Sequence, residues 1–202
     1  MDAVEVYNCS QKDQTKAAVR IERAIKKQHR ISNCAIHSGL AVGIFVDMAN
    51  VVEIRDNIVY AHKTIGIRLD SVTSTSVHNN VVMHIQNRWW MGNTVEPWGG
   101  ITVCSIGGNI CPNVTVTSNI VAGAQYTGFT ARGHNCGDYS TKQFKHNVAH
   151  SIATLSHEGY AAGYGAIVTP DLSSSKQMSE CMESSFFAAY KTVKQGINGG
   201  YL

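Results

Sequence analysis

The sequence predicts an all-β fold, a right-handed parallel β-helix of about seven coils that forms a single domain over residues 1–202. Three observations favour it: a repeat of 23 to 25 residues, short apolar–any–apolar triplets within each repeat, and the absence of a helical periodicity of 3.6 residues. The composition agrees, because charged residues make up only 15% of the chain, whereas glycine and β-branched residues are frequent.

Two positions recur in each repeat and set its register. The first holds a small or amide side chain. The second holds a glycine in most copies and follows nine residues later in four of them, with Ala18 in place of glycine in one. The first, named the asparagine position, holds Cys9, Cys34, Asn57, Asn80, Asn119, Asn147 and, as a weaker match, Ser185. The second, named the glycine position, holds Ala18, Gly43, Gly66, Gly100, Gly128 and, as weaker matches, Gly159 and Gly196.

Three short strands are expected in each repeat. One precedes the asparagine position and one follows it; the third, with the clearest pattern, follows the glycine. The third strand is predicted at residues 19–21, 44–46, 67–69, 101–103 and 129–131. Its outer two residues point inward and its middle residue points outward, because side chains alternate along a strand.

The asparagines are predicted to form a structural ladder. A sharp bend between two sheets needs a residue that tolerates the left-handed region, and asparagine is the best choice after glycine. Amides stacked about 4.8 Å apart on successive coils can also hydrogen-bond to each other. The ladder is expected to contain Cys34, Asn57, Asn80, Asn119 and Asn147, with Cys9 and Cys34 as small buried thiols.

Three insertions leave the coil, near residues 87–97, 104–112 and 151–184. None of the six cysteines has zinc-type spacing, so Cys104 pairs with Cys111, or Cys111 pairs with Cys136, or the thiols stay reduced. Asn8 and Asn113 begin N-x-S/T glycosylation sequons. Together with the even number of cysteines, the sequons favour an extracellular, oxidising environment.

The register also aligns three acidic side chains. Glu22, Asp47 and Asp70 are predicted to stack roughly 5 Å apart on adjacent coils. The outward position two residues earlier holds Arg20, Phe45, Arg68, Thr102 and Thr130. We consider three interpretations: a salt-bridge ladder with Arg20 and Arg68, a Ca²⁺ site, or an acid and base acting on a glycosidic bond.

Aromatic and histidine side chains provide a second group of interest. Trp89, Trp90, Trp98 and Tyr126 could hold a sugar, contact a protein, or fold back over the coil. Arg20 and Arg68 are further candidates for binding a carbohydrate or a partner. His37 and His150 share one repeat position, and we expect them to be single turn or buried histidines rather than metal ligands.

Four segments of the sequence are similar to those of a known family: VEVYNCSQKDQTKAAVRI, CAIHSGLAVGIFVDMANVVEIRDNIVY, SNIVAGAQYTGFTARGHNC and FFAAYKTVKQGI. They resemble the parallel β-helix region of the fibrocystin and fibrocystin-like (polycystic kidney and hepatic disease) family, which is related to the β-helix of the transmembrane hyaluronidase. The resemblance implies one segment of a large secreted or single-pass cell-surface glycoprotein, associated with cilia in several members.

The leading functional hypothesis is a non-enzymatic extracellular structural and interaction module. The alternative is a polysaccharide-active, hyaluronidase-like or lyase-like module, or a glycan-binding one. We expect other extracellular proteins, neighbouring domains of the same chain or polysaccharide as partners, and no cofactor except for the Ca²⁺ considered above. Nucleic acid is not expected, because no recognition motif accompanies the basic residues between positions 12 and 30, and no apolar run could span a membrane.

Overall fold

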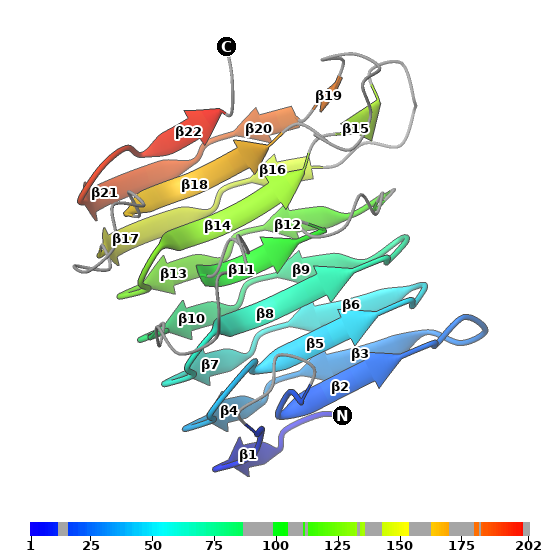
Figure 1. Ribbon diagram of the computed structural model, residues 1–202. Helices are drawn as coiled ribbons and strands as arrows, with labels where there is room; N and C mark the ends of the chain where they lie inside the picture. Colours follow the sequence, from blue (N-terminus) through cyan, green and yellow to red (C-terminus); the bar gives the residue numbers. More distant parts are fainter. Residues whose placement is uncertain are drawn as a thin grey trace.

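The computed structural model describes residues 1–11, 16–86, 99–104, 111, 113–132, 134–135, 143–153, 163–169, 180–181 and 183–199. These residues wind into a solenoid with three parallel sheets stacked along one axis (Figure 1). The predicted fold class is confirmed. No helix long and apolar enough to cross a membrane occurs among the described residues.

Each coil gives one strand to each sheet, except that the first coil gives none to sheet 1, so neighbouring strands in a sheet come from successive coils. Sheet 1 contains β3 (His29–Ser32), β6 (Val52–Arg55), β9 (Ser76–His78), β12 (Thr115–Thr117), β16 (Gln143–Lys145) and β20 (Glu183–Ser185). Sheet 2 contains β1 (Glu5–Tyr7), β4 (Ala35–His37), β7 (Ile58–Tyr60), β10 (Val81–Met83), β13 (Ile120–Ala122), β17 (Val148–Ile152) and β21 (Ala188–Thr192). Sheet 3 contains β2 (Val19–Glu22), β5 (Ile44–Asp47), β8 (Ile65–Asp70), β11 (Gly99–Val103), β14 (Thr127–Arg132), β18 (Tyr164–Thr169) and β22 (Ile197–Gly199). A separate antiparallel pair joins β15 (His134–Asn135) to β19 (Glu180–Cys181).

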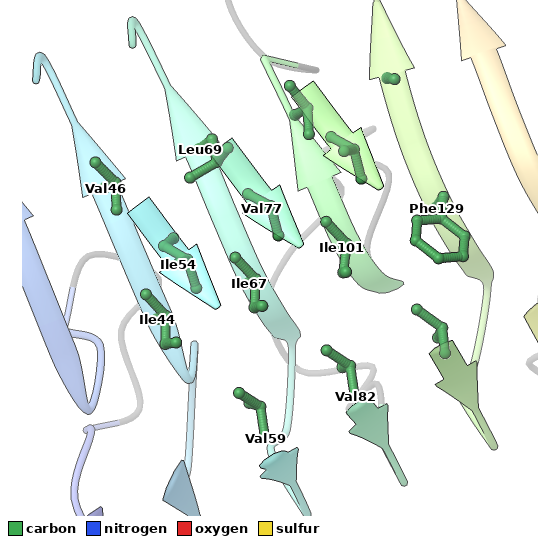
Figure 2. Close-up of a cluster of buried hydrophobic side chains, with 14 of the residues drawn as sticks. Ile44, Val46, Ile54, Val59, Ile67, Leu69, Val77, Val82, Ile101 and Phe129 are labelled. Atoms are coloured by element: carbon green, nitrogen blue, oxygen red, sulfur yellow. The ribbon is translucent and has the colours of Figure 1, made fainter. Parts of the chain in front are cut away.

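The core runs as columns of aliphatic side chains between the three sheets (Figure 2). Ile44 and Val46 of β5 lie beside Ile67 and Leu69 of β8, as the apolar–any–apolar triplets predict. All four side chains are fully buried. Burial of whole columns of Val, Ile and Leu supplies the main favourable free energy of folding.

The corners of the coil use one left-handed residue after each strand. After sheet 1 the backbone φ angle lies between 54° and 58° at Asn33, Asp56, Asn79, Ser118, His146 and Phe186. These residues directly precede the asparagine position. The expectation that the ladder asparagines themselves adopt the left-handed conformation is therefore wrong. The exposed corner residue takes that conformation, and the following residue turns its side chain inward.

The asparagine ladder itself is present in the structure. Asn57 donates from Nδ2 to Asn80 Oδ1 (2.9 Å), Asn80 donates to Asn119 (3.0 Å), and Asn119 donates to Asn147 (3.1 Å). The same Oδ1 atoms accept the backbone N–H of the preceding ladder residue, including that of Cys34 (3.0 Å). These side chains are buried, so the amide is selected for the hydrogen bonds it makes rather than for its backbone preference.

Both ends of the ladder differ from the sequence expectation. Cys34 is buried and its thiol donates to the Ser32 carbonyl oxygen (2.9 Å). The assignment of Cys9 to the asparagine position is wrong, because the pairing of Glu5–Tyr7 with Ala35–His37 puts Val4 beside Cys34 and leaves Cys9, which is exposed, beyond the end of β1. At the other end, Ser185 pairs with Lys145, which places Phe187 at the asparagine position instead. Phe187 packs against Phe144 and Phe129 in place of an amide.

The glycine position forms a second column, and close backbone approach explains it. A Cβ atom built on Gly43, Gly66, Gly100 or Gly128 would lie 2.5–2.7 Å from the carbonyl oxygen of the next residue in the column. Gly165, not Gly159, continues the column toward Gly196. Gly159 lies outside the described residues.

The insertions lie largely outside the described residues, with one correction. Residues 151–184 were expected to leave the coil until Phe186 resumes it. Instead, β18 lies within this range and pairs in parallel with β14 and β22. This strand lies in the coil of Asn147, but eighteen residues rather than nine separate Asn147 from the glycine position at Gly165, so the period alone could not locate the strand.

Candidate functional site

The candidate site is a row of outward side chains on sheet 3. The strand register places Arg20 beside Phe45 and Phe45 beside Arg68. It also places Glu22, Asp47 and Asp70 beside one another at the ends of β2, β5 and β8. The three acidic side chains therefore lie on adjacent coils, as the alignment of the repeats predicts.

Phe45 lies between two guanidinium groups. The Cζ atoms of Arg20 and Arg68 lie 5.0 Å and 4.9 Å from the centre of its ring, a distance typical of cation–π contacts. Phe45 is buried although its side chain points away from the core, and it packs with Val42 and Ile65 in a small second apolar cluster. The aromatic ring thus fixes both arginines over the outer face of the sheet.

Each arginine also forms an ion pair with the acid of its own strand. Arg68 Nε lies 2.7 Å from Asp70 Oδ2, and both side chains are only 9% exposed. Arg20 Nη2 lies 3.1 Å from Glu22 Oε2, and this pair is more exposed. The buried pair matters most for stability, because removing one partner would leave an uncompensated charge away from water, whereas an exposed pair contributes little.

The salt-bridge interpretation describes Glu22 and Asp70 well, since both are neutralised by arginine. Asp47 lies between them and is half-buried. Among the described residues, no three His, Cys, Asp or Glu side chains are grouped so as to hold a metal ion. A Ca²⁺ site and a catalytic role for Glu22, Asp47 or Asp70 stay hypotheses.

The row of outward side chains continues on β11 and β14, where threonines take the place of the arginines and phenylalanine. Thr102 and Thr130 point outward from the sheet and yet are fully buried, and Thr130 Oγ1 lies 3.0 Å from Thr127 Oγ1. Sequence reasoning expected a solvent-exposed face here. The replacement of charged residues by threonine along the column was the available signal of this burial.

Of the aromatic group, only Tyr126 belongs to the described residues. It is half-buried, burial raises its pKa, and its carbonyl oxygen accepts the N–H groups of Gly163 (2.8 Å) and Tyr164 (3.2 Å). Trp89, Trp90 and Trp98 lie outside the described residues, so a binding role for them stays a prediction.

Both glycosylation candidates lie at corners of the coil. Asn8 and Asn113 are exposed and have left-handed backbones, with φ angles of 53° and 56°. Their side chains are therefore sterically open to modification.

A disulfide joins Cys104, at the end of β11, to Cys111, with their Cα atoms 6.1 Å apart. This is one of the two pairings that the sequence left open; Cys136 lies outside the described residues. Both bonded cysteines are fully buried in the core.

Breaking this disulfide is expected to destabilise the fold moderately. The Cys104→Ala/Cys111→Ala double variant should lose about 2 kcal/mol of unfolding free energy, because a short closed loop constrains the unfolded chain. Urea unfolding monitored by circular dichroism would measure it, with the exposed free thiol removed in Cys9→Ser as the control. Peptide mapping without reductant should recover the Cys104–Cys111 linked peptide; recovery of another pairing would contradict the assignment.

Histidine positions follow the register only in part. His37 and His150 do share a column on sheet 2, where each stacks on a tyrosine of the next coil. His62, in contrast, is fully buried and its Nε2 lies 3.3 Å from the Ile36 carbonyl oxygen. Burial lowers the pKa of His62 to about 4.

His62 should make the fold acid-sensitive. The folded state binds no proton at His62 until about pH 4, whereas the unfolded chain binds one below pH 6.5. Its contribution is therefore complete above pH 6.5 and falls as the pH drops toward 4, by about 2 kcal/mol at pH 5. Melting temperatures across this range should fall less steeply in His62→Gln than in the parent. His84→Asn, at an exposed corner, is the control and should keep the parent slope.

Three parallel sheets, a ladder of asparagines and a glycine column define the class of this protein as a right-handed parallel β-helix. The sequence profile of the family described as "Right handed beta helix region" matches residues 2–149, and the chain belongs to this family. Within it, the chain is similar to fibrocystin of the dog (Canis lupus familiaris), with 30% identity over 121 residues, and of the mouse (Mus musculus), with 26% over 121 residues. Both similarities cover 60% of this chain but only 3% of each relative's length. The fibrocystin-like resemblance is thereby confirmed. No solved structure matches the chain.

Proposed function

We propose that this chain is a non-enzymatic, rigid β-helical module within a large extracellular or cell-surface, receptor-like protein. The observation that carries the proposal is the pairing of acids with arginines on sheet 3. Glu22 and Asp70 accept from Arg20 and Arg68, which Phe45 holds in place. A carboxylate whose oxygen is held by a guanidinium group is not free to contact the leaving group of a substrate.

The regularity of the solenoid supports a spacer role. Strands pair in register from β1 to β21 in sheet 2, and the buried amides of the ladder lock successive coils to each other. Each coil contacts only its neighbours, so length can be added coil by coil without a change in cross-section.

Three features support an extracellular or cell-surface location. The disulfide between Cys104 and Cys111 favours an oxidising compartment. Asn8 and Asn113, which begin the two sequons, are exposed, and the similarity to fibrocystin favours the surface of a cell, including that of a cilium. Expression through a secretory pathway tests this location: a loss of mass on glycosidase treatment is expected, and it should disappear in Asn8→Gln/Asn113→Gln.

The function is tested by incubating the chain with hyaluronan and with pectin and following polymer length by gel electrophoresis. We expect no shortening of either polymer. Depolymerisation that is abolished by Asp47→Asn but kept by the control Asp56→Asn, at a corner away from sheet 3, would overturn the proposal. The partners would then be polysaccharides rather than extracellular proteins or neighbouring domains.

A polysaccharide-active module is the second candidate, and one observation favours it. Glu22, Asp47 and Asp70 do lie side by side on β2, β5 and β8, and two carboxyl groups about 5 Å apart suit a retaining glycosidase. Glycan-array binding that is lost in Trp90→Ala, without product formation, would instead favour a glycan-binding module. For Ca²⁺, a melting temperature that calcium raises in the parent but not in Asp47→Asn would favour the metal hypothesis.

A further inference from the structure

The outward face of sheet 2 differs from the rest of the surface, because it is almost wholly apolar. Its outward side chains form two columns parallel to the solenoid axis. The first, named the aliphatic column, holds Glu5, Ala35, Ile58, Val81, Ile120, Val148 and Ala188. The second, named the ring column, holds Tyr7, His37, Tyr60, Met83, Ala122, His150 and Tyr190. Glu5 is the only Asp, Glu, Lys or Arg in either column.

The other two faces do not share this character. Sheet 1 presents an ionic network in which Arg30 and Arg55 both contact Glu53, at 2.5 Å and 3.4 Å. On sheet 3 the outward side chains of Phe45 and Thr102 are already buried. On sheet 2 several apolar side chains are open to solvent: Ile58 is 45% exposed, Ile120 is 39% exposed and Tyr190 is 51% exposed, whereas Val81 and Met83 are half-buried. An uncovered apolar strip of this length is typical of an interaction surface.

The ring column is stacked along the axis, which limits what it can bind. His37 stacks on Tyr60 with centroids 4.5 Å apart and planes 12° apart, and His150 stacks on Tyr190 at 4.9 Å and 6°. The ring faces are thus turned toward neighbouring coils, and the ring edges point outward. A sugar ring packs on the face of an aromatic ring, so this column does not suit a glycan, whereas another set of side chains can interdigitate with it.

Side-chain sizes compensate within single coils. Ala35 accompanies His37, and Ala188 accompanies Tyr190, so a small aliphatic residue lies next to a large ring. In the coil of β13 the sizes are reversed, because Ile120 accompanies Ala122. The strip is therefore low on the aliphatic side and high on the ring side at β4 and β21, and this step is inverted at β13; β7, β10 and β17 carry larger side chains in both columns.

This step is complementary to itself in one arrangement. A two-fold axis parallel to the solenoid axis places the aliphatic column of one copy against the ring column of another, with equal coils facing each other. Ile120 then meets Ala122 of the second copy, and Ala35 meets its His37. A two-fold axis across the strip would set ring against ring, where the high sides collide. We propose that the outward face of sheet 2 binds a second copy of this chain, side by side and parallel, with the aliphatic column against the ring column.

The size of the strip indicates a weak dimer. Seven strands about 4.8 Å apart, with columns about 7 Å apart, give roughly 30 by 12 Å, or roughly 400 Å² per copy. A stable dimer buries about 800 Å² per partner. The contact therefore suits low-affinity association between proteins that hold many such coils, where linked contacts add avidity. This inference rests on the proposed role as an interaction module and names its partner.

Sedimentation equilibrium of the whole chain, in a Cys9→Ser background, tests the surface. We expect concentration-dependent dimerisation, weakened at least tenfold in Ile58→Lys/Ile120→Lys. The matched control Ser76→Lys/Thr117→Lys places the same charges on the outward face of sheet 1 and should dimerise like the parent. Unchanged circular dichroism and melting temperature establish that each variant is folded. A chain that stays monomeric to millimolar concentration, or a dimer that Ile58→Lys/Ile120→Lys leaves intact, as an end-to-end contact would, overturns the proposal.

Cysteine cross-linking tests the geometry. The substitution Val81→Cys places a thiol in the aliphatic column, and Met83→Cys places one in the ring column of the same strand, β10. A mixture of the two variants should oxidise to the mixed dimer at least tenfold faster than either variant alone. Faster cross-linking of like variants would overturn the parallel arrangement. Failure of both experiments would leave the non-enzymatic function standing, since the polymer-degradation assay decides that point separately.

Discussion

Replacing Asn80 by alanine is expected to lower the free energy of unfolding by about 4 kcal/mol. The Asn80 side chain donates to Asn119 Oδ1 and to the carbonyl oxygens of Ile54 and His78, each at 3.0 Å. Its Oδ1 accepts both the backbone N–H and the Nδ2 of Asn57. Each of these buried hydrogen bonds contributes about 1 kcal/mol, and groups left unsatisfied away from water cost more.

Urea unfolding followed by circular dichroism, together with hydrogen exchange of the Asn57 amide, would measure this loss. Asn79→Gly is the matched control: Asn79 is exposed, and glycine keeps its left-handed backbone. We expect the control to change the unfolding free energy by less than about 1 kcal/mol. Equal effects of the two substitutions would show that the ladder contributes no special stability.

Replacing Gly100 by alanine is expected to cost about 3 kcal/mol, for a steric rather than a polar reason. A Cβ atom at this position would overlap Cγ1 of Val121 and would lie 2.7 Å from the Gly128 carbonyl oxygen. Both neighbours are held by the parallel pairing of β11 with β14 and by the buried core, so neither can move away cheaply.

The control for this variant is Gly123→Ala. Gly123 has a φ angle of 65°, and the atom nearest to an added Cβ lies 3.7 Å away. Alanine at this position costs only the free energy of adopting the left-handed backbone conformation, about 1 kcal/mol. Thermal and urea unfolding of both variants should therefore rank Gly100→Ala as clearly the less stable; the reverse order would contradict the close-approach explanation.

Most of the fold was predictable because the repeat sets the register. Once Asn57, Asn80 and Asn119 are aligned, every other position of their coils follows, including the pairing of Arg68 with Phe45. The prediction failed where the spacing or the marker differs. Eighteen residues rather than nine separate Asn147 from Gly165 of β18, and Phe187 fills the asparagine position with a ring, so periodicity alone gave the wrong assignment for Ser185 and for residues 151–184.

The candidate site was predictable in register but not in environment. Sequence alternation tells which way a side chain points, and it pointed Thr102 and Thr130 outward correctly. It does not tell whether another segment covers them, and both are buried. The apolar outward face of sheet 2 could not be predicted for the same reason. Its outward residues are of the same types as core residues, and only the folded coil distinguishes the two sides of the strand.

The sequence by itself determined the coil, because a period near 23 residues with alternating apolar positions fits three short strands per coil, stacked into three parallel sheets. It also placed the asparagines in one column. Only the tertiary structure decided which residue turns the corner, which acids are paired, and which face is left open. Those outcomes depend on contacts between residues more than 20 positions apart, such as Asn57 with Asn80 and Phe45 with Arg68. The energy of such contacts is set by burial and distance, neither of which a local pattern contains.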